Sequence, residues 1–370
     1  MELSDIRKEI DQIDAQLLPL LTARMECAKK VAVYKKEHQI PVLNSFREEE
    51  ILDRVEKETG EYGGTARVIF SAIMSQSRAL QHQMLSAGKP LRQLLQNARE
   101  TPQKSSRIAC LGSPGSYSHL ELLTLYPKAQ PIFCPNFSSV FSTLEKEDAD
   151  LALVPIENSS AGSVLEVYDL LLKYRYYIIA AGKLCVNNVL ASKSGTLDRV
   201  TSLYSHPQPL MQCSTFVESC GLSVKKCRST TEAAAMAAKD PNSAALCGKK
   251  AAEENHLKIV PLKVQNCSAN HTRFLVLSRE LCLSKKADKI SVCFNLPHRT
   301  GSLNGVLSRF AAAGMNLTKI GSRPIIGKEF EYDFYLDFSG NIHDPVVLEL
   351  LCSLWDELPR FSFLGNYSEN

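Results

Sequence analysis

The spacing of apolar residues changes twice along the 370-residue chain, and these changes constrain the fold more than any other feature. Residues 3 to about 87 repeat apolar side chains at helical spacing. From residue 107 onward, short strand-like runs alternate with helical ones, and residues 288 to 367 carry a compact mixed pattern. Since a domain commonly has about 50 to 250 residues, we expect two or three domains.

Composition and charge exclude several classes of protein. Hydrophobic residues make up 44% of the chain and charged residues 22%, which favours buried cores over disorder. The net charge of +3 is too small to favour a nucleic-acid partner. No apolar run reaches the roughly 18 residues of a membrane helix, and the charged start does not resemble a signal peptide. We therefore expect a cytoplasmic protein that does not bind membranes.

The sequence does not favour a metal or a cofactor. The twelve cysteines are scattered without a CxxC pair, as is typical of reduced thiols, and the eight histidines lack metal-ligand spacing. The loop LGSPGSYS at 111–118 exposes amides before a helix, which favours an anion. It is neither a GxGxxG sequence nor a P-loop, so a nucleotide site is disfavoured.

The N-terminal stretch predicts three helices. Apolar residues form a stripe on the first helix: Ile6, Ile10, Ile13, Leu17 and Leu20. Pro19 is expected to kink this helix or to interrupt its hydrogen bonds. Ser45 and Glu48 have the spacing of a capping box that opens the second helix, and the third covers about 65 to 85. Three helices without a closed core of their own suggest dimerisation.

Basic residues on the first helix suggest an anion site. Arg24 and Lys35 lie on nearly the same face, some 16 Å apart at about 1.5 Å rise per residue, so both could grip one small dianion. Arg7 lies roughly 25 Å beyond Arg24 and could reach the same ligand only from an antiparallel partner chain. The alternative for each residue is a solvated basic face.

These residues carry a resemblance to a known family. The segments IRKEIDQIDAQLLPLLTAR, FREEEI and SQSRALQ, together with Lys35, resemble the all-helical chorismate mutases, whose site is built in an intertwined dimer. The resemblance implies that Lys35 and Gln81 donate hydrogen bonds to the ether oxygen whose bond breaks. It implies further substrate-binding residues: Arg7 from the partner, Arg24, Asn44 in place of the usual Asp, Arg47, Glu48 and Ser77. Glu48 has an alternative role in the capping box.

Residues 88 to 106 are polar and predict a linker that could contain a helical turn in its middle. Residues 107 to 282 predict an α/β region with parallel sheets. That region could form one sheet or two lobes with a cleft. Its polar stretches lie at strand ends, where α/β proteins bind ligands. They are LGSPGSYS, VPIENSSAGS, YSHPQPLMQCS, STTEAA and NHTRF. Taken singly, each is typical of a turn or a cap, as at Ser229 and Glu232.

Together these stretches resemble the prephenate dehydratases, whose fold has two α/β lobes around a cleft, similar to periplasmic binding proteins. The resemblance implies that Thr272 is the central catalytic residue. It places four residues around Thr272: Glu157, Asn158, Ser205 and Gln212. Because an alcohol is a poor acid, Thr272 would help hydroxide leave as a hydrogen-bond donor or within a relay. A neighbour such as protonated Glu157 would then supply the acidity. The reaction requires no cofactor.

Residues 288 to 367 predict the strand and helix order βαββαβ, which is the α+β ferredoxin-like order. This segment resembles an ACT domain, and GSLNGVL and GSRP resemble the two motifs by which dehydratase ACT domains bind phenylalanine. The implied effector-binding residues are Gly301, Ser302, Leu303, Gly321, Ser322, Arg323 and Pro324. Ser302 and Gly321 replace the usual Ala and Glu. The alternative is a purely structural dimerisation module.

The three resemblances follow the order of the bifunctional chorismate mutase/prephenate dehydratases of phenylalanine biosynthesis. We therefore expect four parts: an all-α mutase at 1–87, a linker at 88–106, a dehydratase at 107–282 and an ACT regulatory domain at 288–367. The expected small-molecule partners are chorismate, prephenate and the effector phenylalanine, in a homodimer or larger homo-oligomer. A fusion to prephenate dehydrogenase is disfavoured because a dinucleotide fingerprint is missing from the sequence. A non-catalytic amino-acid sensor would not explain Arg24, Lys35 and Gln81.

Overall fold

The chain divides into two compact units. The computed structural model describes residues 2–102, 104–267, 269–299, 301–325 and 327–369. Its first unit combines residues 1–97 with residues 289–363, and its second combines residues 98–288 with residues 364–370. The N-terminal helices therefore share a unit with the C-terminal region, whereas the predicted four-part division treated them separately.

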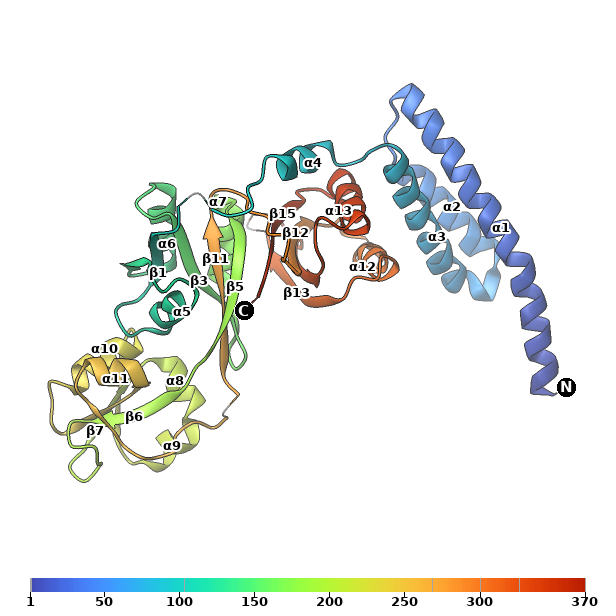
Figure 1. Cartoon of the computed structure of the whole chain (residues 1–370). Helices are drawn as coiled ribbons and strands as arrows, with labels where there is room; N and C mark the ends of the chain where they lie inside the picture. Colours follow the sequence, from blue (N-terminus) through green and yellow to red (C-terminus); the bar gives the residue numbers. More distant parts are fainter. Residues whose placement is uncertain (1, 103, 268, 300, 326, 370) are drawn as a thin grey trace. The chain divides into compact units, whose positions relative to one another are not determined.

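Three helices form the N-terminal part of the first unit (Figure 1). They are α1 (Leu3–His38), α2 (Ser45–Glu58) and α3 (Gly63–Met84), with the short 3-10 turn η1 (Gly60–Tyr62) before α3. The three predicted helices are confirmed. Helices α1 and α2 both pack on α3, and α1 continues through Pro19 as one helix.

The apolar stripe on α1 is exposed. Ile10 and Ile13 are 51% and 55% exposed, and Leu17 is 55% exposed. Among the described residues of α1, the buried ones are Ala28 and Ala32, near its C-terminal end. A large apolar stripe that faces water is typical of a surface that a partner covers.

The predicted capping box of α2 is wrong in its position. Asn44 is the N-cap, and its side-chain oxygen accepts a hydrogen bond from the Arg47 backbone N–H at 3.0 Å. Ser45 is instead the first helical residue. Asn caps a helix as well as Ser does, so the sequence pattern left two adjacent candidates. The Glu48 carboxylate is not part of a Ser45 box and instead contacts Arg78.

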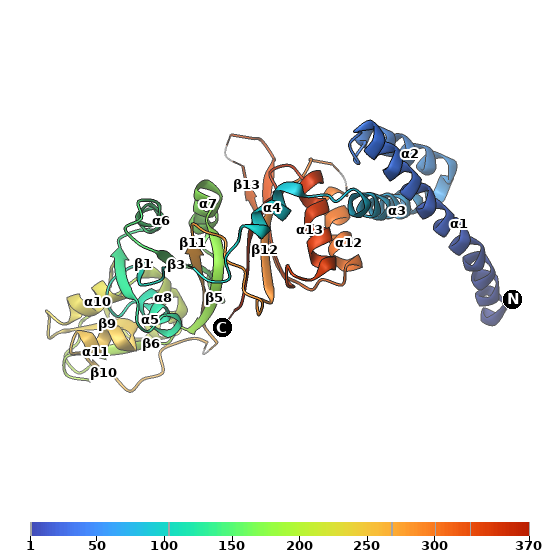
Figure 2. The same cartoon turned by 45° about the horizontal axis from the view of Figure 1, so that its top comes forward.

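The C-terminal region, which belongs to the first unit up to Phe363, has the predicted βαββαβ order. Its elements are β12 (Lys289–Asn295), α12 (Ser302–Ala312), β13 (Leu317–Pro324), β14 (Tyr332–Ser339), α13 (Pro345–Glu357) and β15 (Ser362–Tyr367). The strand order in the sheet is β13-β14-β12-β15. Figure 2 shows α12 and α13 on one face of this sheet, and both helices also pack on α3. The predicted linker contains a helix, α4 (Lys89–Gln96), which packs on α13.

The second unit contains two sheets with their own helices. The first sheet has the order β2-β1-β3-β11-β5, with β4 paired to β3. Its strands are β1 (Arg107–Leu111), β2 (Gln130–Cys134), β3 (Leu151–Asn158), β4 (Gly162–Ser163), β5 (Tyr177–Cys185) and β11 (His271–Ser278). The helices beside them in sequence are α5 (Tyr117–Leu125), α6 (Phe137–Glu145) and α7 (Leu165–Tyr174).

The second sheet has the order β10-β6-β9-β7-β8. Its strands are β6 (Asn188–Ser192), β7 (Ser202–Ser205), β8 (Ser223–Lys226), β9 (Ser243–Gly248) and β10 (Lys258–Ile259). Its helices are α8 (Pro207–Gln212), α9 (Ser214–Ser219), α10 (Thr230–Ala237) and α11 (Lys249–Glu254). The two sheets correspond to the two-lobed alternative, and we call them the first and second lobes.

The expectation of parallel sheets is wrong, because both sheets are mixed. In the first lobe β1 pairs parallel to β2 and β3, whereas β11 runs antiparallel between β3 and β5. The chain leaves the first lobe after β5 and returns only at β11, from the opposite direction. A local hydrophobic pattern does not specify strand direction, so the sequence could not reveal this return.

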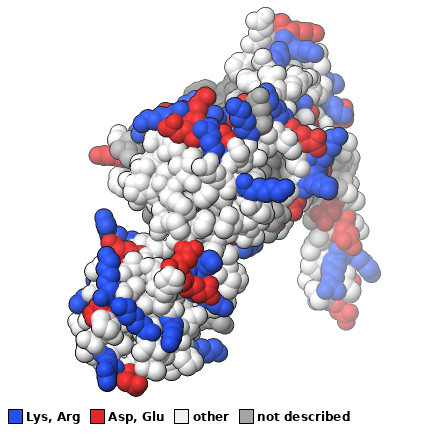
Figure 3. Space-filling model, turned by 60° about the vertical axis from the view of Figure 1, so that its left-hand side comes forward, with Lys and Arg blue, Asp and Glu red and all other residues white. Residues whose placement is uncertain are grey.

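The charges on the surface, the lengths of the helices and the state of the cysteines bear on the composition of the chain. On the face shown in Figure 3, basic and acidic side chains are interspersed. Within the part of the chain that the structure describes, no helix is both long enough and apolar enough to span a membrane. All twelve cysteines are free thiols.

Candidate functional sites

A pocket of about 330 Å³ in the first unit collects most of the predicted residues of the N-terminal helices. Seven of them line it: Arg24, Lys35, Asn44, Arg47, Glu48, Ser77 and Gln81. Helices α1, α2 and α3 each contribute. Arg7 is not among the described residues that line this pocket, as its distance along α1 predicts. The arrangement places several cations around one small space.

Hydrogen bonds orient the side chains of Arg24 and Ser77 in this pocket. Arg24 Nη1 donates to Ser77 Oγ at 2.9 Å, and Ser77 Oγ donates to the Ile73 carbonyl at 2.9 Å. The Gln81 side chain is only 6% exposed, and its carboxamide oxygen has no hydrogen-bond partner within the described residues. An unsatisfied buried amide usually has a partner such as water or a ligand. Gln81 therefore lines the pocket with an acceptor oxygen that has no partner among the described residues, and the donor role of its NH2 group stays a prediction.

Lys35 lies at the boundary between solvent and the pocket. Its ammonium group donates to the Val42 carbonyl. Burial lowers the pKa of Lys35, Glu48 acts in the opposite direction, and Arg78 lowers the pKa further. The pocket therefore brings like charges together, as a site for a dianion would require.

Arg78 is a pocket residue to which the sequence analysis assigned no role. Its Nη1 atom donates to both carboxylate oxygens of Glu48, at 2.6 and 2.5 Å, and its Nε atom lies 3.2 Å from Glu357 Oε2. Glu357, at the end of α13, also contacts Arg309 and His82, at 2.8 Å each. Burial raises the pKa of Glu357, but contacts with His82, Arg309 and Arg78 outweigh this effect and lower it to about 2.

The second cluster forms where β11 returns to the first lobe. The register pairs Thr272 with Asn158, at the start of β11 and the end of β3. Asn158 Nδ2 donates to Thr272 Oγ1 at 2.9 Å and to Asn270 Oδ1 at 2.8 Å. Asn270 is almost fully buried, and its own amide nitrogen has no partner within the described residues. The Asn158 amide nitrogen therefore contacts both the Thr272 hydroxyl and the Asn270 side chain.

Backbone amides fix the orientation of Asn158. Its Oδ1 atom accepts from the backbone N–H groups of Ser160 and Ala161, at 3.0 Å each. A backbone N–H can only donate, so the Asn158 nitrogen must be the atom that faces Thr272. Thr272 Oγ1 therefore accepts, and no described residue takes its proton. The Thr272 hydroxyl is left to donate toward a ligand.

A chain of hydrogen-bonded side chains links the two lobes. It leads from Asn158 in the first lobe through two residues of the second lobe and ends at Tyr117 in the first lobe. Gln212 Nε2 donates to Asn158 Oδ1 at 3.4 Å, and Asn188 Nδ2 donates to Gln212 Oε1 at 3.1 Å. Tyr117 OH lies 3.0 Å from both Asn188 Oδ1 and the Asn187 carbonyl oxygen, and its single proton can be donated to either. Burial raises the pKa of Tyr117, so this phenol stays protonated. The amide donors of the chain point toward Thr272, an arrangement in which hydrogen bonds strengthen one another.

Two predicted residues lie outside this chain. Ser205 is fully buried in β7, and its hydroxyl donates to the Leu246 carbonyl at 2.7 Å. None of the described contacts joins it to Thr272. Glu157 precedes Asn158 on β3, and neighbouring strand residues point to opposite faces, so the register does not favour Glu157 as the acid beside Thr272. The catalytic roles of both residues stay predictions.

Sequence reasoning missed three residues of the second cluster. Tyr117 and Asn270 lie inside stretches that the sequence analysis selected, LGSPGSYS and NHTRF, and their polar side chains were the available signal. Asn188 opens β6, a strand that was not predicted. The short apolar run of residues 189–191 between Asn188 and Ser192 was the signal that could have identified it.

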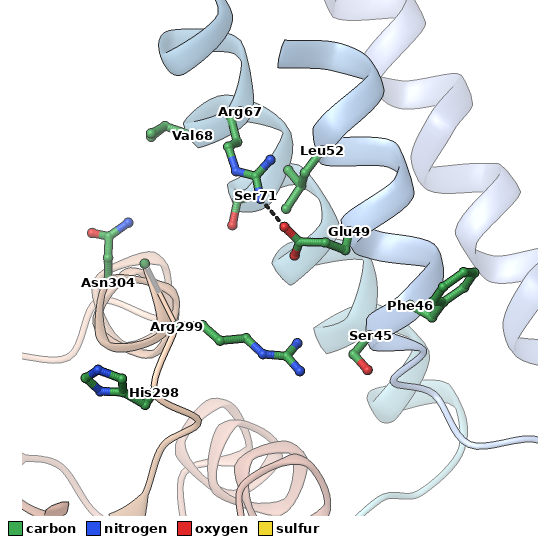
Figure 4. Close-up of a pocket in the computed structure, with 11 residues that line it drawn as sticks. Ser45, Phe46, Glu49, Leu52, Arg67, Val68, Ser71, His298, Arg299 and Asn304 are labelled. Carbon is green, nitrogen blue, oxygen red and sulfur yellow. Dashed lines mark hydrogen bonds and ion pairs between the residues drawn. The ribbon is translucent and has the colours of Figure 1, made fainter. Parts of the chain in front are cut away.

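The first of the two predicted effector motifs borders a cavity of about 680 Å³ in the first unit. Gly301 has a φ of 81° and is the N-cap of α12, which starts at Ser302 and Leu303. Figure 4 shows the Arg299 side chain extending toward Ser45 of α2. The second motif, residues 321–324, ends the edge strand β13. The roles of Gly321, Ser322, Arg323 and Pro324 stay predictions.

Two family models match the chain. The model for chorismate mutase type II matches residues 6–82, and the model for prephenate dehydratase matches residues 108–281. A curated relative from Aquifex aeolicus is described as a bifunctional chorismate mutase/prephenate dehydratase. It is 30% identical over 373 residues, which cover 99% of this chain and 98% of the relative.

Two solved structures resemble most of the chain. A prephenate dehydratase from Arthrobacter aurescens in complex with L-Phe has a TM-score of 0.65 and 29% identity, and the match covers 71% of this chain and 89% of that one. GqqA, described as a novel type of quorum quenching acylase, has a TM-score of 0.64 and 26% identity, covering 71% and 98%. One fold thus carries two described activities, so the function must be argued from residues and from the whole chain.

The buried ion pairs of Glu357 predict how stability depends on pH. Its folded-state pKa of about 2 lies below the ordinary 4.5, so its ionised form stabilises the fold above about pH 4.5. This contribution is lost as the pH falls toward 2. Glu357→Gln leaves Arg78 and Arg309 without their carboxylate and should cost about 3 kcal/mol near neutral pH. The difference in melting temperature between wild type and variant should narrow as the pH falls.

Calorimetry of both proteins from neutral pH down to about pH 3 checks this expectation. Glu349→Gln is the matched control, because Glu349 is on the same helix and pairs with Arg92 at a more exposed position. It should change stability by less than about 1 kcal/mol. A difference for Glu357→Gln that stays constant with pH would contradict the assignment.

Proposed function

The chain belongs to the family of bifunctional chorismate mutase/prephenate dehydratases, and we propose that its two reactions take place at the two clusters described above. It rearranges chorismate to prephenate and then converts prephenate to phenylpyruvate in phenylalanine biosynthesis. The observation that carries this function is the whole-length relative, together with one family model for each reaction. The residue roles that follow are proposals.

The pocket of α1, α2 and α3 suits the mutase reaction. The rearrangement of chorismate is intramolecular, so the site must fold the substrate and stabilise the negative charge that develops on the ether oxygen. Arg24 and Arg47 hold the substrate carboxylates, and Lys35 and Gln81 donate to the ether oxygen. Holding the reactive conformer is an orientation effect, and a preorganised donor is typically worth about 3 kcal/mol.

A second copy of the chain completes this site in our proposal. Arg7 lies roughly 25 Å from Arg24 along α1, too far to reach the same substrate. The exposed apolar side chains of Ile10, Ile13 and Leu17 give α1 a stripe that a partner α1 would cover. An antiparallel partner would bring its own Arg7 toward the pocket. The mutase is therefore expected to act as a homodimer.

The cluster around Thr272 suits the dehydratase reaction. The departing carboxylate leaves its electron pair in the ring as CO₂ forms, and the ring C–O bond breaks with its electron pair on hydroxide. The Thr272 hydroxyl donates to this leaving oxygen, while Asn158 donates to Thr272 Oγ1. Carboxamides do not release protons readily, so the amide chain orients Thr272 and does not relay protons. The proton that turns hydroxide into water comes from solvent.

Phenylalanine is the effector in this proposal, bound by an ACT-type domain formed by residues 288–367. Two observations support it: the βαββαβ order with the cavity beside Gly301, and the similar dehydratase that was solved with L-Phe. The N-cap of α12 makes no side-chain capping hydrogen bond, and a helix N-terminus favours a carboxylate.

Lys35→Ala should remove the mutase activity and spare the dehydration of added prephenate. Loss of the ammonium removes one donor to the ether oxygen, so kcat should fall at least about 100-fold. Chorismate consumption and phenylpyruvate formation, followed separately, check this result. Lys36→Ala is the control, because Lys36 is the next residue and is exposed. If both activities fell together in Lys35→Ala, separate sites would be wrong.

Thr272→Ser should retain dehydratase activity within about tenfold, because it keeps the hydroxyl. Thr272→Val has nearly the same shape but no donor, and should lose about 100-fold or more. Turnover of prephenate by the two variants checks the role of the hydroxyl, with mutase turnover as the internal control for folding. If Thr272→Val were active, the Thr272 hydroxyl would have no catalytic role, and NHTRF would be only a turn.

L-Phenylalanine should inhibit dehydration in wild type, with D-phenylalanine as the ligand control. Gly301→Ala should raise the concentration for half-inhibition about tenfold, because a side chain at φ 81° strains the N-cap of α12. Gly314→Ala is the matched control: this glycine has a φ of 71°, lies beyond the end of α12 and has equally open surroundings. Equal sensitivity of both variants would argue against an effector site at Gly301.

A further inference from the structure

The mutase pocket is connected to the C-terminal part of the chain through Arg78. We propose that Arg78 is a positioning residue that fixes Glu48 in the mutase pocket, and that Glu357 of α13 holds Arg78 in place. This inference rests on the proposed function of the pocket formed by α1, α2 and α3. It makes residue 357, far along the sequence, part of the support of the mutase site.

Arg78 is placed to control the charge of Glu48. Both residues line the pocket, and one guanidinium nitrogen contacts both carboxylate oxygens. The Arg78 side chain is 16% exposed and that of Glu48 is 25% exposed, so water screens the pair only partly. Without Arg78, the Glu48 carboxylate would face a dianionic substrate uncompensated. The pair therefore lets Glu48 serve as a hydrogen-bond acceptor in a cationic pocket.

Glu357 holds the other side of the same guanidinium. Its Oε2 atom lies 3.2 Å from Arg78 Nε and 2.8 Å from Arg309 Nη1. Its other oxygen lies 2.8 Å from His82, on the same helix as Arg78. Glu357 is thus buried among three side chains from α3 and α12. Arg78 therefore bridges a carboxylate on α2 and a carboxylate on α13. Rotation of the Arg78 side chain away from Glu357 would break a buried ion pair.

The same connection reaches the region of the first effector motif. Arg309 lies on α12, the helix that Gly301 caps, and also donates to Ser353 of α13. The cavity beside Gly301 is lined by Ser45 and Glu49 of α2, which flank Glu48 in sequence. In Figure 4 these α2 side chains face Arg299 across the cavity, and Glu49 pairs with Arg67. A change in α12 or α13 therefore has a short path to Glu48.

A merely structural ion pair would have a different signature. If the pair were only structural, Arg78→Met would lower the stability of the protein without changing the mutase reaction of the folded protein. A positioning role requires that removal of Arg78 acts through Glu48. The two interpretations separate in a double-mutant cycle, since residues that act through one another give non-additive effects.

The test uses the full-length chain with Arg78→Met, Glu48→Gln and the double variant. Arg78→Met alone should raise the KM for chorismate about tenfold or more, because Glu48 then repels the dianion. In the Glu48→Gln background the same substitution should change KM by less than about twofold. Dehydration of added prephenate should stay at the wild-type rate in all three proteins, and their far-UV circular dichroism should match wild type, which shows that the helices of the first unit are folded. Equal effects of Arg78→Met in both backgrounds would overturn the positioning role.

Glu357→Gln tests the contribution of α13. It should raise the KM for chorismate at least about fivefold and add nothing further to Arg78→Met. Glu349→Gln, on the same helix but paired with Arg92, should leave KM unchanged. If Glu357→Gln does not fold, Arg78→Lys replaces it, because lysine keeps the charge but cannot bridge two carboxylates. It should then show a KM between wild type and Arg78→Met.

The result separates this inference from the proposed function. A wild-type KM in folded Glu357→Gln, or in Arg78→Lys where that variant replaces it, would overturn the role of α13 while Lys35→Ala still abolished the mutase reaction. A wild-type protein without chorismate turnover would instead defeat the proposed function itself.

Discussion

The antiparallel insertion of β11 between β3 and β5 is the constraint on which the second unit depends. This pairing closes the first lobe after the chain has built the second, and it places Thr272 opposite Asn158. Two backbone N–H groups then fix the Asn158 amide, and that orientation passes through Gln212 and Asn188 to Tyr117. A single register thus determines which atom of each side chain donates. A shift by one residue would turn Thr272 to the other face.

In our proposal, the two clusters solve different physical problems. The pocket of α1, α2 and α3 gathers cations around a dianion whose developing negative charge must be stabilised. The cluster around Thr272 is a chain of neutral amides that orients a hydroxyl toward a leaving oxygen. Buried charges and buried amides both need partners, and each cluster supplies its own: Glu48 and Glu357 for Arg78, and backbone amides for Asn158.

Much of this arrangement could be predicted from the sequence, and the exceptions share a cause. Long apolar periodicities gave the three N-terminal helices and the βαββαβ order, because local spacing determines such elements. The predicted strand direction in the second unit was wrong, because the direction of β11 depends on the side from which the chain returns to the first sheet. The motif residues Lys35 and Gln81 line one pocket, and Asn158 and Thr272 pair in one register, whereas their catalytic roles stay predictions. Arg78 was missed because its partner Glu357 is 279 residues away. Asn44 and not Ser45 is the N-cap of α2, and the sequence could not distinguish them because both residue types are common helix caps.

The central claim is that one chain holds two separate sites, and we further expect prephenate to pass between them through solution. The most direct measurement mixes Lys35→Ala protein with Thr272→Val protein and supplies chorismate alone. Each variant by itself should form almost no phenylpyruvate, and the mixture should form it after a lag during which prephenate accumulates. A mixture that forms none, although Thr272→Val makes prephenate and Lys35→Ala dehydrates added prephenate, would contradict exchange through solution. Phenylpyruvate formation from chorismate by either variant alone would contradict the assignment of the sites.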